Sequence, residues 1–246
     1  MQEALRLQRG HAPGAGRGDR AGADRRKRRI RCQGRGTHRN MYQGGRYVHL
    51  AADMKGYDGD IYVILDISNP AKPVEAGRWW MPGMNRAAGE QASFPAGKRV
   101  ALHHMITAGD RGYGAWRDGG FTIHDLSNPA APKLISHVNW SPPFPGGTHT
   151  PLPLPGRKLA VVADEANAEK CAKGMFRTFV VDLRAEENPV PISTLPQPEE
   201  RDFCSTGVFG PHNLHENRPG TFQSEETIFA TYNVAGVRVF DIRNAY

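Results

Sequence analysis

The chain has 246 residues, enough for one large domain or two small ones. Its formal net charge of +7 is misleading, because residues 1–35 alone carry a balance of +8 and residues 36–246 carry about −1. A nearly neutral body argues against nucleic acid as its partner. The sequence has no run of 18 apolar residues, so we expect no membrane span and no membrane partner.

Residues 1–35 form an Arg/Gly/Ala-rich segment without hydrophobic periodicity. The basic run at residues 25–29 fits a nucleic-acid or targeting patch, a disordered tail, or a translated stretch that does not belong to the fold. We expect a disordered tail outside the fold, with the folded domain at residues 36–246. The tail lacks the apolar core of a secretory signal, so the cytoplasm is the default localisation.

Residues 36–246 contain four repeated units. Each unit begins with a polar segment that contains a histidine. The third apolar run of each unit ends at an aspartate. The aspartates are Asp66, Asp125, Asp182 and Asp241, at intervals of 59, 57 and 59 residues. In the first three units an arginine follows the histidine by eight residues, at Arg46, Arg111 and Arg157. A fixed period of this length indicates a repeat architecture.

Each unit predicts four short strands. The histidine-bearing strand leads through a tight turn to a second strand, such as residues 47–52 or 158–163. The third strand ends at the aspartate, and an outer strand such as residues 133–138 follows in the first three units. Four strands per period are typical of a propeller blade, and a solenoid is the competing repeat architecture. No segment keeps a helical period, so we expect an all-β fold.

The last unit stops at residues 241–246, without its outer strand. An incomplete blade would leave an exposed sheet edge. Two alternatives therefore stay open: a four-bladed ring with an imperfect last blade, or a piece of a larger ring.

The segments IYVILDISNP (residues 61–70) and FTIHDLSNP (residues 121–129) resemble the LVIVD repeats of bacterial β-propeller proteins. The flanking stretches at residues 36–40, 77–83 and 210–215 are similar to that family too, so the resemblance covers residues 36–246. It implies an all-β β-propeller with four recognisable blade repeats. Members are usually longer, which favours a central fragment of a larger ring. The resemblance implies a fold and hardly any activity.

One histidine recurs at an equivalent position in each unit: His38, His103, His149 and His212. The innermost strands of a propeller surround a central channel, so we expect these imidazoles to converge on its axis. Imidazole is a common ligand of transition metals. The alternative is that a repeated histidine hydrogen-bonds the backbone of the next blade and only maintains the repeat.

Acidic side chains are expected at the same height along the channel axis as these histidines. Glu90 and Glu165 offer oxygen ligands of the kind that suits Ca²⁺, or they are solvated loop ends. His215, three residues after His212, could add a ligand or orient one. We therefore expect metal ligands at His38, His103, His149, His212, Glu90 and Glu165, and catalytic roles for His149, His212 and His215. The repeated aspartates are expected to be structural turn residues.

Three functions fit this pattern. The leading hypothesis is a metal-dependent hydrolase of small lactones or esters, acyl-homoserine lactones among them. A divalent ion, with calcium favoured by analogy with unrelated propeller lactonases, would polarise the carbonyl of the small-molecule substrate. The second is a non-catalytic propeller that binds a protein or carbohydrate. The third is a copper or iron oxidoreductase, which rests on a resemblance of the histidine pattern to selenium-binding propeller proteins.

Cys32, Cys171 and Cys204 are widely spaced and form no CxxC motif, which excludes a zinc knuckle. Cys171 and Cys204 could pair in an exported protein. We expect two unpaired thiols.

Overall fold

The computed structural model describes residues 36–245, and the interpretations of residues 1–35 lie outside this range. The described chain consists of β-strands and three short 3-10 helices, without an α-helix. The expected all-β class is therefore confirmed. Within these residues, no helix has the length and apolar character needed to cross a membrane.

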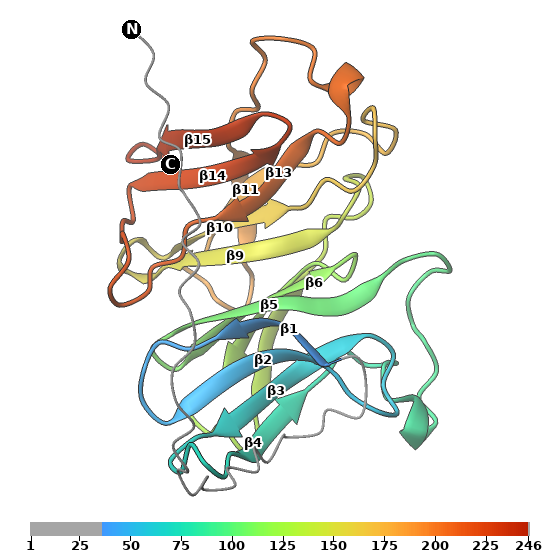
Figure 1. Cartoon of the computed structure of the whole chain (residues 1–246), viewed down its shortest axis with the longest axis vertical. Helices are drawn as coiled ribbons and strands as arrows, with labels where there is room; N and C mark the ends of the chain where they lie inside the picture. The colour runs from blue at the N-terminus through green and yellow to red at the C-terminus, as the bar shows by residue number, and fades with distance from the viewer. Residues whose placement is uncertain (1–35, 246) are drawn as a thin grey trace, which may run out of the picture.

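The strands follow the four predicted units in chain order, from blue to red in Figure 1. The first unit holds β1 (Gly36–Met41), β2 (Tyr47–Asp53), β3 (Asp60–Asp66) and β4 (Val74–Trp79). The second holds β5 (Val100–Ala108), β6 (Arg111–Arg117), β7 (Phe121–Asp125) and β8 (Lys133–Val138). The third holds β9 (Thr148–Leu154), β10 (Leu159–Asp164), β11 (Thr178–Asp182) and β12 (Val190–Thr194). The fourth holds only β13 (Gly210–Leu214), β14 (Thr227–Asn233) and β15 (Gly236–Asp241). The 3-10 helices are η1 (Arg86–Ala88), η2 (Pro155–Arg157) and η3 (Cys204–Thr206).

The third strand of every unit ends at its repeated aspartate, as expected. In each case the carboxylate Oδ1 accepts a hydrogen bond from the backbone N–H two residues further on. The donors are Ser68, Ser127, Arg184 and Arg243, at 2.8–2.9 Å. A side-chain acceptor at this place ends the strand and starts the turn, which confirms the structural interpretation of these aspartates.

The sheets are antiparallel throughout. The first unit forms the sheet β1-β2-β3-β4, and the last forms β13-β14-β15. The second and third units merge into one eight-stranded sheet, because the single pair Arg117↔Thr148 joins β6 to β9. Arg117 has a positive φ of 53°, which marks a sharp turn of the chain at this join. The units thus form a propeller-like succession of curled sheets, and no strand pairing joins the first sheet to the last among residues 36–245.

The core consists of three apolar clusters, each between two successive units. Ile64 and Met105 belong to the cluster between the first and second units. Ile123 and Val162 lie between the second and third, and Val180 and Ile228 lie between the third and fourth. Each unit is therefore stabilised mainly by packing against its neighbours, as in other repeat proteins.

The expectation of unpaired thiols is wrong, because Cys171 and Cys204 form a disulfide. It ties the loop after β10 to the segment that leads into β13. The backbone N–H of Lys170 donates to Gly207 O at 2.9 Å beside it. The two cysteines are 33 residues apart and belong to different units, so their spacing alone could not decide the pairing.

Candidate functional site

The four repeated histidines are consecutive neighbours on the first strands of the units. The ring centroids of His38 and His103 are 4.7 Å apart, those of His103 and His149 are 3.6 Å apart, and those of His149 and His212 are 4.7 Å apart. The strands β1, β5, β9 and β13 thus bring together the side chains that the repeat register predicts to meet.

Glu165 reaches this group because of strand pairing. The antiparallel pairing of β9 with β10 sets the start of β9 beside the end of β10. Glu165 directly follows β10 and therefore lies beside His149, the second residue of β9. The next residue, Ala166, donates its backbone N–H to Pro211 O at 3.2 Å. This hydrogen bond places β13, and with it His212, beside Glu165.

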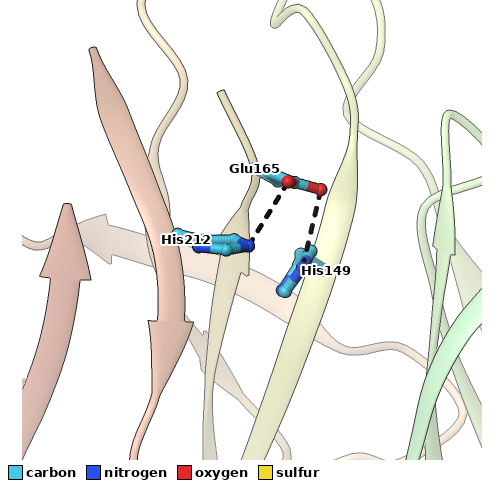
Figure 2. Close-up of side chains that lie close together, drawn as sticks. All are labelled: His149, Glu165 and His212. Atoms are coloured by element: carbon cyan, nitrogen blue, oxygen red, sulfur yellow. Dashed lines mark ion pairs between the residues drawn. The ribbon is translucent and has the colours of Figure 1, made fainter. Parts of the chain in front are cut away.

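The Glu165 carboxylate lies between His149 and His212 (Figure 2). Its Oε2 is 3.5 Å from Nε2 of His149, and its Oε1 is 3.3 Å from Nε2 of His212. One ligand atom from each of the three residues lies within 4.8 Å of the others. A tetrahedral ion with bonds of ~2.0–2.1 Å holds its donor atoms about 3.3–3.4 Å apart. The two distances from Glu165 to the histidines are close to this value, and this is the one group of three such residues found in residues 36–245.

Two imidazoles of this row, those of His103 and His149, are held neutral. Burial lowers the pKa of His103 to about 2, and the positive charge of Arg117 adds to the effect. Burial likewise lowers the pKa of His149 far below its ordinary value, with His103 and Arg117 contributing. Neutral imidazole is the form that ligates a metal ion, so protonation of His149 does not compete with a ligand role for this residue at neutral pH.

His38 and His103 are already hydrogen-bonded. The Nδ1 of His103 lies 2.9 Å from the carbonyl oxygen of His149, which can only accept, so this nitrogen carries the proton. In neutral His103 the Nε2 then accepts from Nε2–H of His38, at 2.9 Å. These bonds run from one unit to the next, which fits the repeat-maintaining role better than a ligand role for this half of the row.

Arg117 is a functional-site residue that the sequence did not indicate. Its Nη1 donates to Oε2 of Glu165, and only 8% of Arg117 is exposed. The ion pair with Arg117 is sufficient to explain why a carboxylate lies at this position without a bound metal ion. The positive charge of the guanidinium also disfavours the binding of a cation next to it. Arg117 escaped notice because it belongs to no repeated motif.

Glu90 and His215 do not join the group. The Glu90 carboxylate accepts from Trp80 Nε1 at 3.1 Å and from the backbone N–H groups of Gly83 and Asn85, at 2.8 and 3.0 Å. His215 accepts from Phe229 N–H at 3.1 Å through its Nδ1. Both side chains are engaged by their own loops or strands, so the geometry gives no support to a metal-ligand role for Glu90 or a catalytic role for His215.

A second cluster of ionisable groups surrounds His104, the neighbour of His103 in β5. Its fully buried Nε2 lies 3.7 Å from Oε1 of Glu216, which also accepts from Arg39 Nη2 at 2.9 Å. Arg218 forms an ion pair with the same carboxylate. Burial, together with the charges of Arg39 and Arg218, lowers the pKa of His104 to about 3. The Arg39–Glu216 pair connects the first unit to the segment after β13.

The sheets and the shared histidine position define an all-β repeat protein with propeller-like units. Residues 52–80 and 108–139 match the LVIVD repeat, so the resemblance is confirmed for these two segments and the chain contains LVIVD repeats. No curated protein matches it. Among solved structures, the computationally designed Ika4 protein is similar over 85% of this chain and 92% of its own, at 9% identity and a TM-score of 0.45. A structural genomics protein of unknown function from Bacteroides thetaiotaomicron VPI-5482 is similar over 84% of this chain and 41% of its own, at 10% identity and a TM-score of 0.47.

Proposed function

We propose that this protein is a non-catalytic, propeller-like binding scaffold that holds a divalent transition metal ion at His149, Glu165 and His212. The LVIVD repeats support the scaffold. The proximity of three ligand atoms, within 4.8 Å of one another, supports the metal. Arg117 engages Oε2 of Glu165, so its positive charge lowers the affinity of the group for a cation without removing Oε1, which faces His212. In this proposal residues 36–246 are one propeller domain, either a four-bladed ring with an imperfect last blade or a piece of a larger ring. Its partner is a protein or carbohydrate rather than a nucleic acid.

The ligand set favours zinc, copper or iron over calcium. Calcium takes six to eight oxygen ligands at ~2.3–2.6 Å. The group offers two imidazole nitrogens and one carboxylate, a set typical of transition metals. The imidazoles of the row therefore argue against the calcium ion that the lactonase analogy suggested.

The hydrolase hypothesis has no separate support. Neither the repeats nor the comparisons contain evidence of hydrolytic activity, and His215 is held away from the group by its bond to Phe229. Three protein ligands would leave a coordination position for water, which is the feature of catalytic zinc sites. Lactone hydrolysis is therefore one of the outcomes of the test below.

The test is calorimetric titration of the EDTA-treated full chain with Zn²⁺. We expect one ion per chain, and about 10–100-fold weaker binding in Glu165→Gln and in His149→Ala, since each removes a ligand atom. His137→Ala is the matched control, because His137 is exposed on β8 and should leave binding unchanged. Circular dichroism verifies that each variant is folded.

Two results would overturn the proposal. Zinc binding that is absent, or equally strong in the two ligand variants, removes the metal site. Hydrolysis of an acyl-homoserine lactone that requires the ion and disappears in His149→Ala contradicts a non-catalytic scaffold and restores the hydrolase.

A further inference from the structure

The three proposed metal ligands come from two different sheets. His149 lies on β9 and Glu165 directly follows β10, both in the eight-stranded sheet, whereas His212 lies on β13 of the three-stranded sheet. The β9–β10 pairing continues to Glu165, because its backbone N–H donates to Gly147 O at 2.8 Å. No strand ladder joins β10 to β13 among the described strands. The place of His212 relative to Glu165 therefore depends on other contacts between the third and fourth units.

The loop after Glu165 runs antiparallel to the segment that leads into His212. Three backbone contacts hold the two segments in a single register: Ala166 N–H donates to Pro211 O at 3.2 Å, Glu169 pairs with Val208 in an isolated antiparallel bridge, and Lys170 N–H donates to Gly207 O at 2.9 Å. The same register, continued by one residue, sets Glu165 opposite His212. The alignment of these two ligands is thus a property of the contact between the two segments.

The Cys171–Cys204 disulfide closes the far end of this contact, directly after Lys170. Lys170 and Cys171 have positive φ angles of 52° and 53°, a conformation that residues other than glycine keep only when their surroundings hold them there. The apolar cluster between the units is non-directional, so it does not by itself select one register. The few backbone hydrogen bonds are individually weak in water. The covalent bond is therefore the strongest restraint on the register.

We propose that the Cys171–Cys204 disulfide positions Glu165 opposite His212, and that its reduction lowers the affinity of the metal site. This inference rests on the proposed metal site. Both cysteines are partly exposed, so a dithiol reductant can reach the bond. Reduction breaks the S–S bond, transfers two hydrogen atoms from the dithiol to the two sulfurs, and leaves the reductant as a disulfide. The freed segments then spend time out of register, and binding of an ion must first restore it.

The first experiment titrates the EDTA-treated full chain with Zn²⁺ in the calorimeter, well below the melting temperature. We expect at least ~10-fold weaker binding in Cys171→Ser with Cys204→Ser than in the oxidised wild type. Gly77→Ala is the matched control, because it disturbs the contact of the first unit with Pro129 of the second and leaves the disulfide intact. It should bind zinc like the wild type, which separates positioning from a general loss of stability.

The second experiment reads the register without a metal ion. Hydrogen exchange of the Ala166 amide, which donates to Pro211 O across the contact, should be at least ~10-fold faster in the double serine variant and in the dithiol-reduced wild type. The Glu165 amide is the internal control. It donates to Gly147 within its own sheet, so its exchange should change far less.

The outcomes separate this inference from the proposed function. Equal zinc affinity in the oxidised wild type and the double serine variant would overturn the inference and leave the metal site intact. A wild type that binds no zinc would overturn the metal site and, with it, the effect on affinity. Exchange at Ala166 that is unchanged by reduction would refute the positioning role whether or not zinc binds.

Discussion

His124 makes the stability of the fold sensitive to acid. The residue before the terminal aspartate is Leu65, Val181 or Phe240 in the other units, but a histidine in the second. The His124 side chain is fully buried and packs against Trp79, with ring centroids 4.5 Å apart. Both ring nitrogens are buried without a hydrogen-bond partner of standard geometry. A charge at this place would be costly.

The size of the stability loss in acid follows from the pKa of His124. Burial lowers the pKa of His124 from 6.5 to about 3. Below pH 6.5 the unfolded chain takes up a proton at this residue, whereas the folded chain stays neutral until the pH approaches the lower value. The contribution to stability is therefore complete above pH 6.5 and is lost as the pH falls. Each pH unit costs about 1.4 kcal/mol, so His124 alone should cost about 2 kcal/mol at pH 5.

The assay compares urea unfolding of the wild type and of His124→Leu at pH 7 and pH 5. The variant should lose about 2 kcal/mol less than the wild type between these values, since only the His124 contribution is removed. Phe240→Leu is the control, because it changes the equivalent position of the fourth unit and keeps the titrating group. It should show the acid loss of the wild type. An equal loss in His124→Leu and the wild type would refute the assignment of this sensitivity to His124.

Two further predictions concern the covalent and steric constraints of the fold. The Cys171–Cys204 disulfide spans 33 residues, so Cys171→Ser with Cys204→Ser should lower stability by roughly 3–4 kcal/mol and Tm by about 7–15 °C. An unchanged Tm in differential scanning calorimetry, with or without reductant, would show that the bond is not formed. Gly77→Ala should cost about 1–3 kcal/mol, because a Cβ on Gly77 would lie 2.2 Å from Pro129 O and 3.1 Å from Ala130 Cα, both backbone atoms of the next unit. A Tm equal to that of the wild type would contradict this close approach.

The fold could be predicted because its signals are local and repeated. The terminal aspartates mark the strand ends correctly, since each carboxylate caps a turn only two residues away. The merging of the second and third units could not be predicted, because it depends on the single pair Arg117↔Thr148. The disulfide was missed for a related reason: it joins two loops that belong to different units.

The candidate site was only partly predictable. The row of histidines follows from register, because equivalent positions of successive units become neighbours in space. Glu90 and His215 lie apart from the row, and sequence position alone does not show that Trp80 and Phe229 engage them. Arg117 and Glu216 lie where the units differ from one another, so no repeated pattern marked them.

This difference between repeated and unique residues explains why the His149–His212 end of the histidine row is a better candidate for a metal site than the His38–His103 end. The residue directly after the second strand is Met54, Asp118, Glu165 or Val234 in the four units. Asp118 is used locally, since it accepts from the backbone N–H of Arg99 at 2.8 Å. Of these four residues, only Glu165 turns a carboxylate towards the histidines. The repeat therefore supplies an imidazole in every unit, and the variable residue after the second strand supplies the carboxylate beside His149 and His212.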